Sequence, residues 1–117
     1  MDEKIREQKV AALLGFAQKA GKLVSGDDMV AAAAKKGKIL LYVVAYDIGE
    51  NTKKEFIHMV KKTSVPWGIW GDKAHLGYVI GKAPRALVGV TEENFAKALQ
   101  LWLEGWNQGI KEEWLNG

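Results

Sequence analysis

The residues best suited to chemistry are a hydroxyl and two carboxylates just ahead of an alanine-rich segment. Ser25, Asp27 and Asp28 precede Met29, Val30 and four consecutive alanines. Hydroxyl and carboxylate oxygens accept hydrogen bonds from the open amides at the start of a helix, and on residue types alone this capping role is favoured. The same oxygens can accept hydrogen bonds from the amino and imino groups of nucleic-acid bases, which is the second interpretation.

The sequence contains no stretch that fits an enzyme motif. A phosphate-binding loop needs four residues between its glycines and a Ser or Thr after the lysine, whereas five residues separate Gly15 from Gly21 and Leu23 follows the lysine. The chain has no cysteine, and its two histidines, His58 and His75, fall on different predicted helices. The sequence therefore predicts no catalytic residues, no metal and no cofactor.

The charge is unevenly distributed along the chain. Residues 1–85 hold 15 Lys or Arg against 9 Asp or Glu, whereas residues 86–117 hold 2 against 5. The basic part is suited to an anionic partner, although an ordinary solvated surface has a similar composition. Phosphates flanking a base-reading site would be attracted by Lys22, Lys35, Lys36 and Lys38.

Hydrophobic patterning predicts alternating helices and strands. The run ILLYVVAY, residues 39–46, lacks polar alternation and predicts a strand covered on both faces. An extended edge segment is predicted at 22–25, and further strands at 67–70 and 86–90. Helices are predicted at 5–19 and 26–36, from Asn51 or Thr52 to before Pro66, from the Asp72 cap to Gly81, and from Thr91 onward. This order predicts a three-layer α/β/α sandwich with a small mixed sheet.

The 117 residues are enough for a single domain, residues 1–117. A tryptophan-rich helical extension is predicted at about 101–117, where an apolar stripe contains Trp102, Trp106, Ile110 and Trp114. Core packing is the commonest reason for such a stripe; a protein partner or self-association is the alternative. No apolar run approaches the roughly 20 residues of a membrane span, so a cytoplasmic protein without a membrane partner is expected.

Loops that follow parallel strands gather at one edge of a sandwich, where ligands usually bind. We therefore expect residues 22–28 to lie at the same edge as Asp47, which follows the central strand. The bend around Pro84 is expected beside them. Exposed amides at the start of the 26–36 helix would complete this edge as a binding surface.

Four stretches of the chain carry a family resemblance: GKLVSGDDMVAAAAKKGK, DIGENTKK, LGYVIGKAPRALVGV and TEENFAKAL. Together they resemble the L7Ae type of kink-turn RNA-binding ribosomal proteins, and in particular the short bacterial YlxQ-like branch. The resemblance covers residues 5–100. It implies an α/β/α sandwich, no enzymatic activity, no cofactor, and recognition of structured RNA, ribosomal or regulatory, rather than DNA.

The resemblance also implies where RNA would bind. In that family the first turn of the second helix reads guanines of tandem sheared G·A pairs, and the loop before the last strand packs on bulged nucleotides. The best-known binders have an Asn-Glu pair and a later Lys where this chain has Asp28, Met29 and Ala32. Composition and resemblance together predict these RNA-binding residues: Lys22, Ser25, Gly26, Asp27, Asp28, Met29, Lys36, Asp47, Lys82, Ala83, Pro84 and Arg85.

Overall fold

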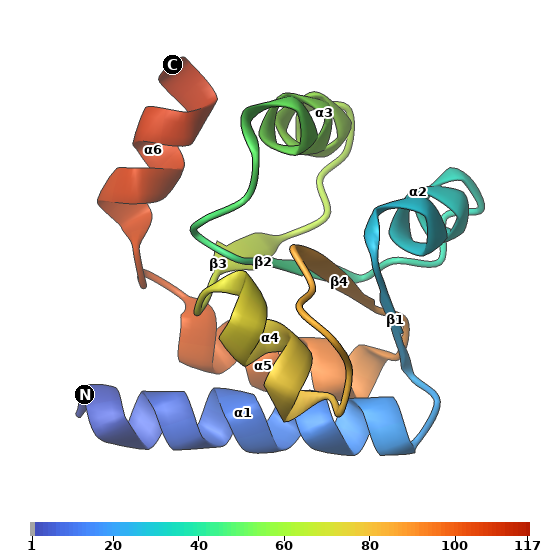
Figure 1. Cartoon of the computed structure of the whole chain (residues 1–117), viewed down its shortest axis with the longest axis vertical. Coiled ribbons are helices and arrows are strands. Elements are labelled where there is room, and N and C mark those ends of the chain that lie inside the picture. The colour runs from blue at the N-terminus through green and yellow to red at the C-terminus, as the bar shows by residue number, and fades with distance from the viewer. Residues whose placement is uncertain (1) are drawn as a thin grey trace.

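Helices and strands alternate through most of the chain. The computed structural model describes residues 2–117, and Figure 1 shows their arrangement. The elements within this part are α1 (Glu3–Lys19), β1 (Leu23–Ser25), α2 (Asp27–Lys35), β2 (Leu41–Val44), α3 (Glu50–Lys61), β3 (Trp67–Ile69), α4 (Lys73–Val79), β4 (Leu87–Val90), α5 (Glu93–Leu103) and α6 (Gln108–Asn116).

The four strands form one mixed sheet in the order β1-β4-β2-β3. β2 pairs with β3 in parallel, whereas β4 is antiparallel to both β1 and β2. β1, β2 and β3 therefore run in the same direction, with β4 reversed between β1 and β2. The carboxyl ends of β1, β2 and β3 and the amino end of β4 share one edge, called here the groove edge. The opposite edge is called the far edge.

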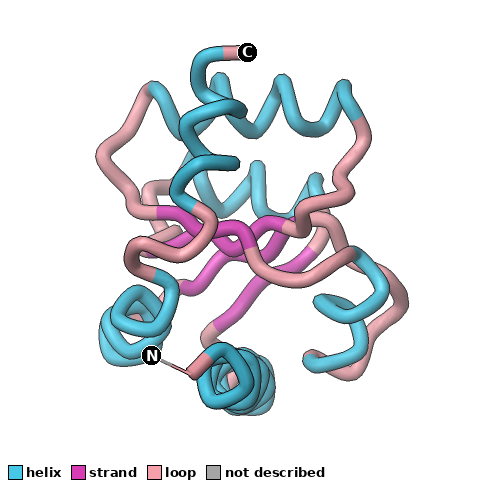
Figure 2. Tube along the Cα trace, turned by 90° about the vertical axis from the view of Figure 1, so that its left-hand side faces the viewer, coloured by secondary structure: helices cyan, strands magenta, loops and turns pink. Residues whose placement is uncertain are grey.

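Helices cover both faces of the sheet (Figures 1 and 2). α2 and α3 lie on one face, and α1, α4 and α5 lie on the other, which confirms the predicted α/β/α sandwich. The predicted burial of the central strand holds at Ile39 and from Leu41 to Ala45, whereas Leu40 and Tyr46 are 39% and 60% exposed. Phe56 of α3 packs edge-on against Tyr42, with ring centroids 5.8 Å apart, and this burial raises the pKa of Tyr42.

The predicted caps of three helices have different outcomes in the structure. The predicted Asp72 cap is confirmed, because its Oδ1 accepts a hydrogen bond from the His75 amide at 2.7 Å. The predicted caps of α2 are wrong: Gly26 precedes the helix with φ 93°, and no side chain caps it. α3 also begins without a side-chain cap, at Gly49 rather than Asn51 or Thr52.

Replacing Asp72 with alanine is expected to lower the free energy of unfolding by about 1 kcal/mol, because the His75 amide loses its acceptor. Asp72→Asn keeps an acceptor oxygen and should cost much less. Urea denaturation followed by circular dichroism measures both variants. Equal losses for Asn and Ala would show that the side-chain bond does not stabilise the start of α4.

The predicted long final helix is two helices. Gly105, with φ 76°, and Asn107, with φ 56°, adopt left-handed backbone between α5 and α6 and turn the chain. In Figure 2, α6 stands in front of the sheet, at its β3 side. Asn107 Nδ2 and Lys111 Nζ donate to the β3 carbonyls of Ile69 and Trp67, at 2.9 and 2.6 Å. This position partly buries Lys111, and burial lowers its pKa.

Candidate functional site

The groove edge brings together two segments that are 60 residues apart. Arg85 Nε donates to Ser25 Oγ at 3.2 Å, and the Gly26 amide donates to the Leu87 carbonyl at 3.0 Å. Between them lies a groove of about 550 Å³, called here the edge groove. It is lined by Ser25, Gly26, Asp27, Gly49, Thr52, Lys73, Pro84, Arg85 and Ala86.

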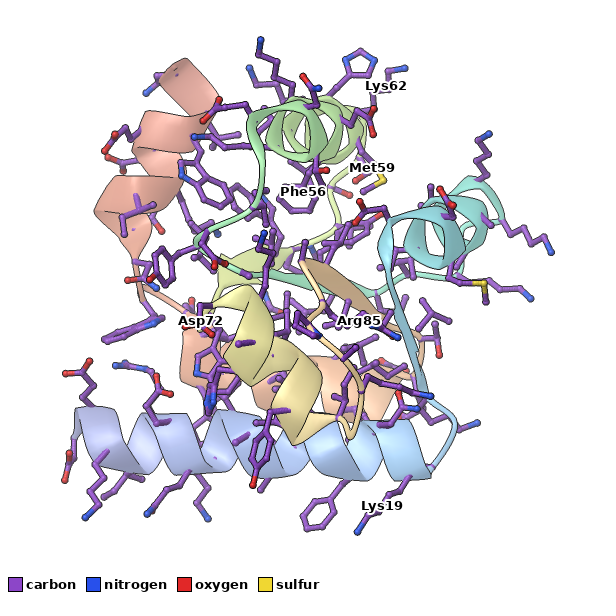
Figure 3. The ribbon with its side chains drawn as sticks, in the orientation of Figure 1. Lys19, Phe56, Met59, Lys62, Asp72 and Arg85 are labelled. Carbon is purple, nitrogen blue, oxygen red and sulfur yellow. The ribbon has the colours of Figure 1, made fainter. Side chains whose placement is uncertain are left out.

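Arg85 is fixed by the bend that carries it. Its Nη1 donates to the carbonyls of Ala83 and Pro84 at 3.0 and 3.2 Å, and its backbone amide donates to the Lys73 carbonyl. Figure 3 places its side chain near β1, at the front of the molecule. These bonds and the one to Ser25 occupy Nε and Nη1, which leaves Nη2 without a protein acceptor within residues 2–117. A bound anion can therefore be contacted by a pre-positioned guanidinium.

The start of α2 forms the opposite wall of the edge groove. Because no side chain caps α2, the first amides of the helix keep their donors for a ligand. Asp27 lines the groove, and the exposed Asp28 and Met29 follow it along α2, outside the groove lining. Thr52 Oγ1 donates to Asp27 Oδ2 at 3.4 Å and links the starts of α2 and α3. The wall thus presents both amide donors and carboxylate acceptors.

Asp47 follows β2 and holds Lys73, one of the residues that line the edge groove. Its Oδ1 accepts a hydrogen bond from the Lys73 amide at 2.9 Å, which ties the end of β2 to the start of α4. Sequence reasoning missed four lining residues, Gly49, Thr52, Lys73 and Ala86. The first three follow the carboxyl ends of β2 and β3, so the shared direction of those strands was the available signal, and Ala86 directly follows the predicted Arg85.

Other predicted site residues lie elsewhere. The Lys22 carbonyl accepts from the Thr91 amide, which puts Lys22 at the far edge, and Lys36 follows the last residue of α2. The expectation that residues 22–28 would all lie at one edge is therefore wrong. Lys36 and Met29 line a different hollow, along α2. Lys82 and Ala83 are exposed in the bend before Pro84.

Neither a metal-binding cluster nor a membrane-spanning helix is present among residues 2–117. No three His, Cys, Asp or Glu side chains among residues 2–117 are close enough together to hold a metal ion. None of the described helices is both long and apolar enough to cross a membrane.

The architecture defines the class of protein: a mixed-sheet α/β/α sandwich with a groove between a helix start and a strand-leading bend. The model of the ribosomal protein L7Ae/L30e/S12e/Gadd45 family matches residues 8–100, and the chain belongs to this family. The match covers the edge groove, all of α2, α3 and α4, and most of α1 and α5. It confirms the resemblance drawn from the motifs.

Relatives within the family place the chain in its bacterial YlxQ-like branch. It is 35% identical over 98 residues to the RNA-binding protein YlxQ of Enterococcus faecium, covering 84% of this chain and 94% of that protein. It is 36% identical over 87 residues to the RNA-binding protein YlxQ of Bacillus subtilis (strain 168), covering 74% of this chain and 87% of that protein.

Solved structures show the same fold. A protein with unknown function from Bacillus halodurans C is similar with a TM-score of 0.78 and 30% identity, over 82% of this chain and 97% of that chain. The Giardia lamblia 15.5kD RNA binding protein is similar with a TM-score of 0.71 over 97% of this chain and 92% of that chain. At 14% identity, this second likeness concerns the fold alone.

Proposed function

We propose that this chain is a cytoplasmic, non-enzymatic RNA-binding protein that recognises a sharply bent, kink-turn-like RNA in the edge groove. The observation that carries the proposal is the Arg85–Ser25 hydrogen bond, which holds the bend before β4 against the start of α2. These are the two segments that the family resemblance assigns to RNA. The curated relatives named above are RNA-binding proteins.

The chemistry of the two walls suits a helix-internal-loop-helix RNA. Open amides of α2 are donors for the O6 and N7 acceptors of guanine, and the Asp27 and Asp28 carboxylates are acceptors for base amino and imino groups. Arg85 Nη2 and Lys82 supply cationic donors for phosphates on the other wall. In this proposal the RNA base edges face the start of α2, and the RNA sugar-phosphate backbone faces the protein bend before β4.

The departures from the best-known binders define what this site prefers. Asp28 accepts hydrogen bonds but, when ionised, donates none, so it suits the N1 and N2 donors of guanine. Met29 and Ala32 supply no charge, so a phosphate contact made there by other members is missing. We therefore propose that selectivity rests on guanine edges and on the bent shape of the RNA, with less help from phosphates near the start of α2.

Replacing Arg85 with alanine is expected to weaken binding of a kink-turn RNA about tenfold or more, since a hydrogen bond between charged groups contributes roughly 1.5–3 kcal/mol. The same change removes the bond to Ser25, which positions the bend. Fluorescence anisotropy at several salt concentrations measures the affinity and its salt dependence. Arg85→Lys keeps the positive charge but cannot donate to Ser25 in the same geometry. Its RNA affinity should therefore lie between those of the native chain and Arg85→Ala.

An unbent RNA is the control that makes this test specific to the proposal. An unbent RNA duplex of equal length should bind the native chain less tightly than the kink-turn RNA, and Arg85→Ala should narrow that difference. Equal affinity of the native chain for both RNAs at low salt would refute kink-turn recognition.

The C-terminal helix is a weaker candidate as a protein-interaction surface, because Trp106 is covered by Arg6 and Trp114 by Trp67.

A further inference from the structure

A cluster of five lysines lies at the end of the molecule opposite the edge groove. Its members, called here the lysine face, are Lys35, Lys36, Lys38, Lys61 and Lys62, and all five are exposed. Within residues 2–117, none of the five forms an ion pair. The segments 29–46 and 56–71, which contain them, have no Asp or Glu. The cluster is therefore a positively charged surface whose charges are not neutralised by neighbouring carboxylates.

The topology explains why these lysines gather. α2 and α3 each return from the carboxyl end of a strand, and those strands, β1 and β2, run in the same direction. Both helices therefore begin at the groove edge and end at the far edge. A basic residue in the last turn favourably meets the helix dipole, as Lys35 and Lys61 do. Lys36, Lys38 and Lys62 lie beyond the last turns, so the dipole alone does not require them.

Hollows on both flanks of α2 lead to the lysine face. Between α2 and α3 a hollow of about 280 Å³ is left by the short side chains of Ala31 and Ala34, and Lys35, His58 and Lys62 rim it. Figure 3 shows Met59 and Lys62 on the side of α3 that faces α2. On the other flank a hollow of about 290 Å³ runs from Met29 to Lys36 and Lys38. No carboxylate lines either hollow.

We infer that the lysine face is a second RNA contact, which binds the phosphate backbone of a helical stem extending from the RNA held in the edge groove. This inference rests on the proposed function. α2 has nine residues and spans about 13 Å between the two sites. Double-stranded DNA carries one charge per roughly 1.7 Å of its axis, and an A-form RNA stem has a smaller rise, so at least about eight phosphate charges lie along that distance. A bent RNA with a long stem can therefore reach both sites.

RNA fits this surface better than an acidic protein segment does. The lysines surround the end of α2 on both flanks, and their flexible stems carry point charges that suit spaced phosphates. The flank that begins at Met29 is also continuous with the start of α2, where the edge groove begins. A stem leaving that groove would follow this flank toward Lys36 and Lys38.

The test uses two RNAs with the same bend, one with a stem just long enough to close it and one with that stem extended by about one turn. The variants are Lys35→Ala/Lys36→Ala/Lys38→Ala and Lys61→Ala/Lys62→Ala. The matched control is Lys4→Ala/Lys9→Ala/Lys19→Ala on α1, which lies on the opposite face and removes as many exposed charges as the triple variant (Figure 3). Thermal melts check that every variant is folded.

The native chain is expected to bind the long RNA at least tenfold more tightly than the short one. In the triple variant, affinity should fall about tenfold for the long RNA and less than about threefold for the short RNA. The slope of log affinity against log salt concentration should become shallower by about 0.9 for each phosphate contact removed. The α1 control should lose less than about threefold on both.

Three results would overturn the inference. Equal affinity of the native chain for the two RNAs would show that the stem makes no contact. Equal losses in the triple variant and the α1 control would show that net charge alone is acting. An unaffected triple variant would leave the lysine face to a different partner, such as an acidic protein. Failure of the proposed function is distinct, because the short bent RNA would then bind no better than an unbent duplex.

Discussion

Replacing Trp114 with alanine is expected to lower the free energy of unfolding by about 3 kcal/mol. Trp114 is 9% exposed and stacks on Trp67, with ring centroids 6.2 Å apart. Trp67 in turn meets Phe56 edge-on, and Phe56 meets Tyr42. The aromatic chain thus runs from the central strand to α6. Truncating its last ring removes buried apolar area and leaves a cavity beside β3.

The matched control for Trp114 is Ile110→Ala, on the same helix. Ile110 is 39% exposed, so its truncation should cost less than about 1 kcal/mol. Urea denaturation measured by circular dichroism compares the two variants. RNA affinity should not change in either variant, because α6 lies outside the family match and does not line the edge groove. Similar losses for the two variants would show that α6 is not docked through Trp114.

The parts of the fold that were predictable depend on local patterns. Residues 39–46 are almost wholly apolar, and this alone predicted a strand between two helical layers. The Asp72 cap was predictable because its acceptor lies three residues before its donor, His75. Both signals are contained within short stretches of sequence, so no knowledge of distant neighbours was needed.

The parts that were not predictable depend on partners far along the chain. Ser25 was predicted to cap α2, but its hydroxyl is held by Arg85, which is 60 residues away. Lys22 was placed with the site because it is close in sequence, yet it precedes β1, whereas Ser25 is the last residue of that strand. The break before α6 needed left-handed backbone at a non-glycine residue, Asn107, which composition does not reveal.

Replacing Gly77 with alanine is expected to damage both stability and RNA binding, because this glycine lets the bend before β4 approach α4. A Cβ at Gly77 would lie 2.7 Å from the Ala83 carbonyl carbon and 2.9 Å from Pro84 Cα. Both are backbone atoms, so the bend must move. Overpacking of this kind costs about 3 kcal/mol at the upper end of its usual range.

The moved bend carries Arg85 away from Ser25, so affinity for the kink-turn RNA should fall about thirtyfold or more, beyond the loss in Arg85→Ala. Gly109→Ala is the matched control, since nothing lies within 4 Å of a Cβ there and α6 should tolerate it. Binding is measured at a temperature where melts show the variant folded. A folded Gly77→Ala chain with native RNA affinity would contradict the assignment of the bend to RNA. If the bend before β4 moves while the start of α2 stays in place, a fall in affinity would show that RNA binding needs both walls of the edge groove.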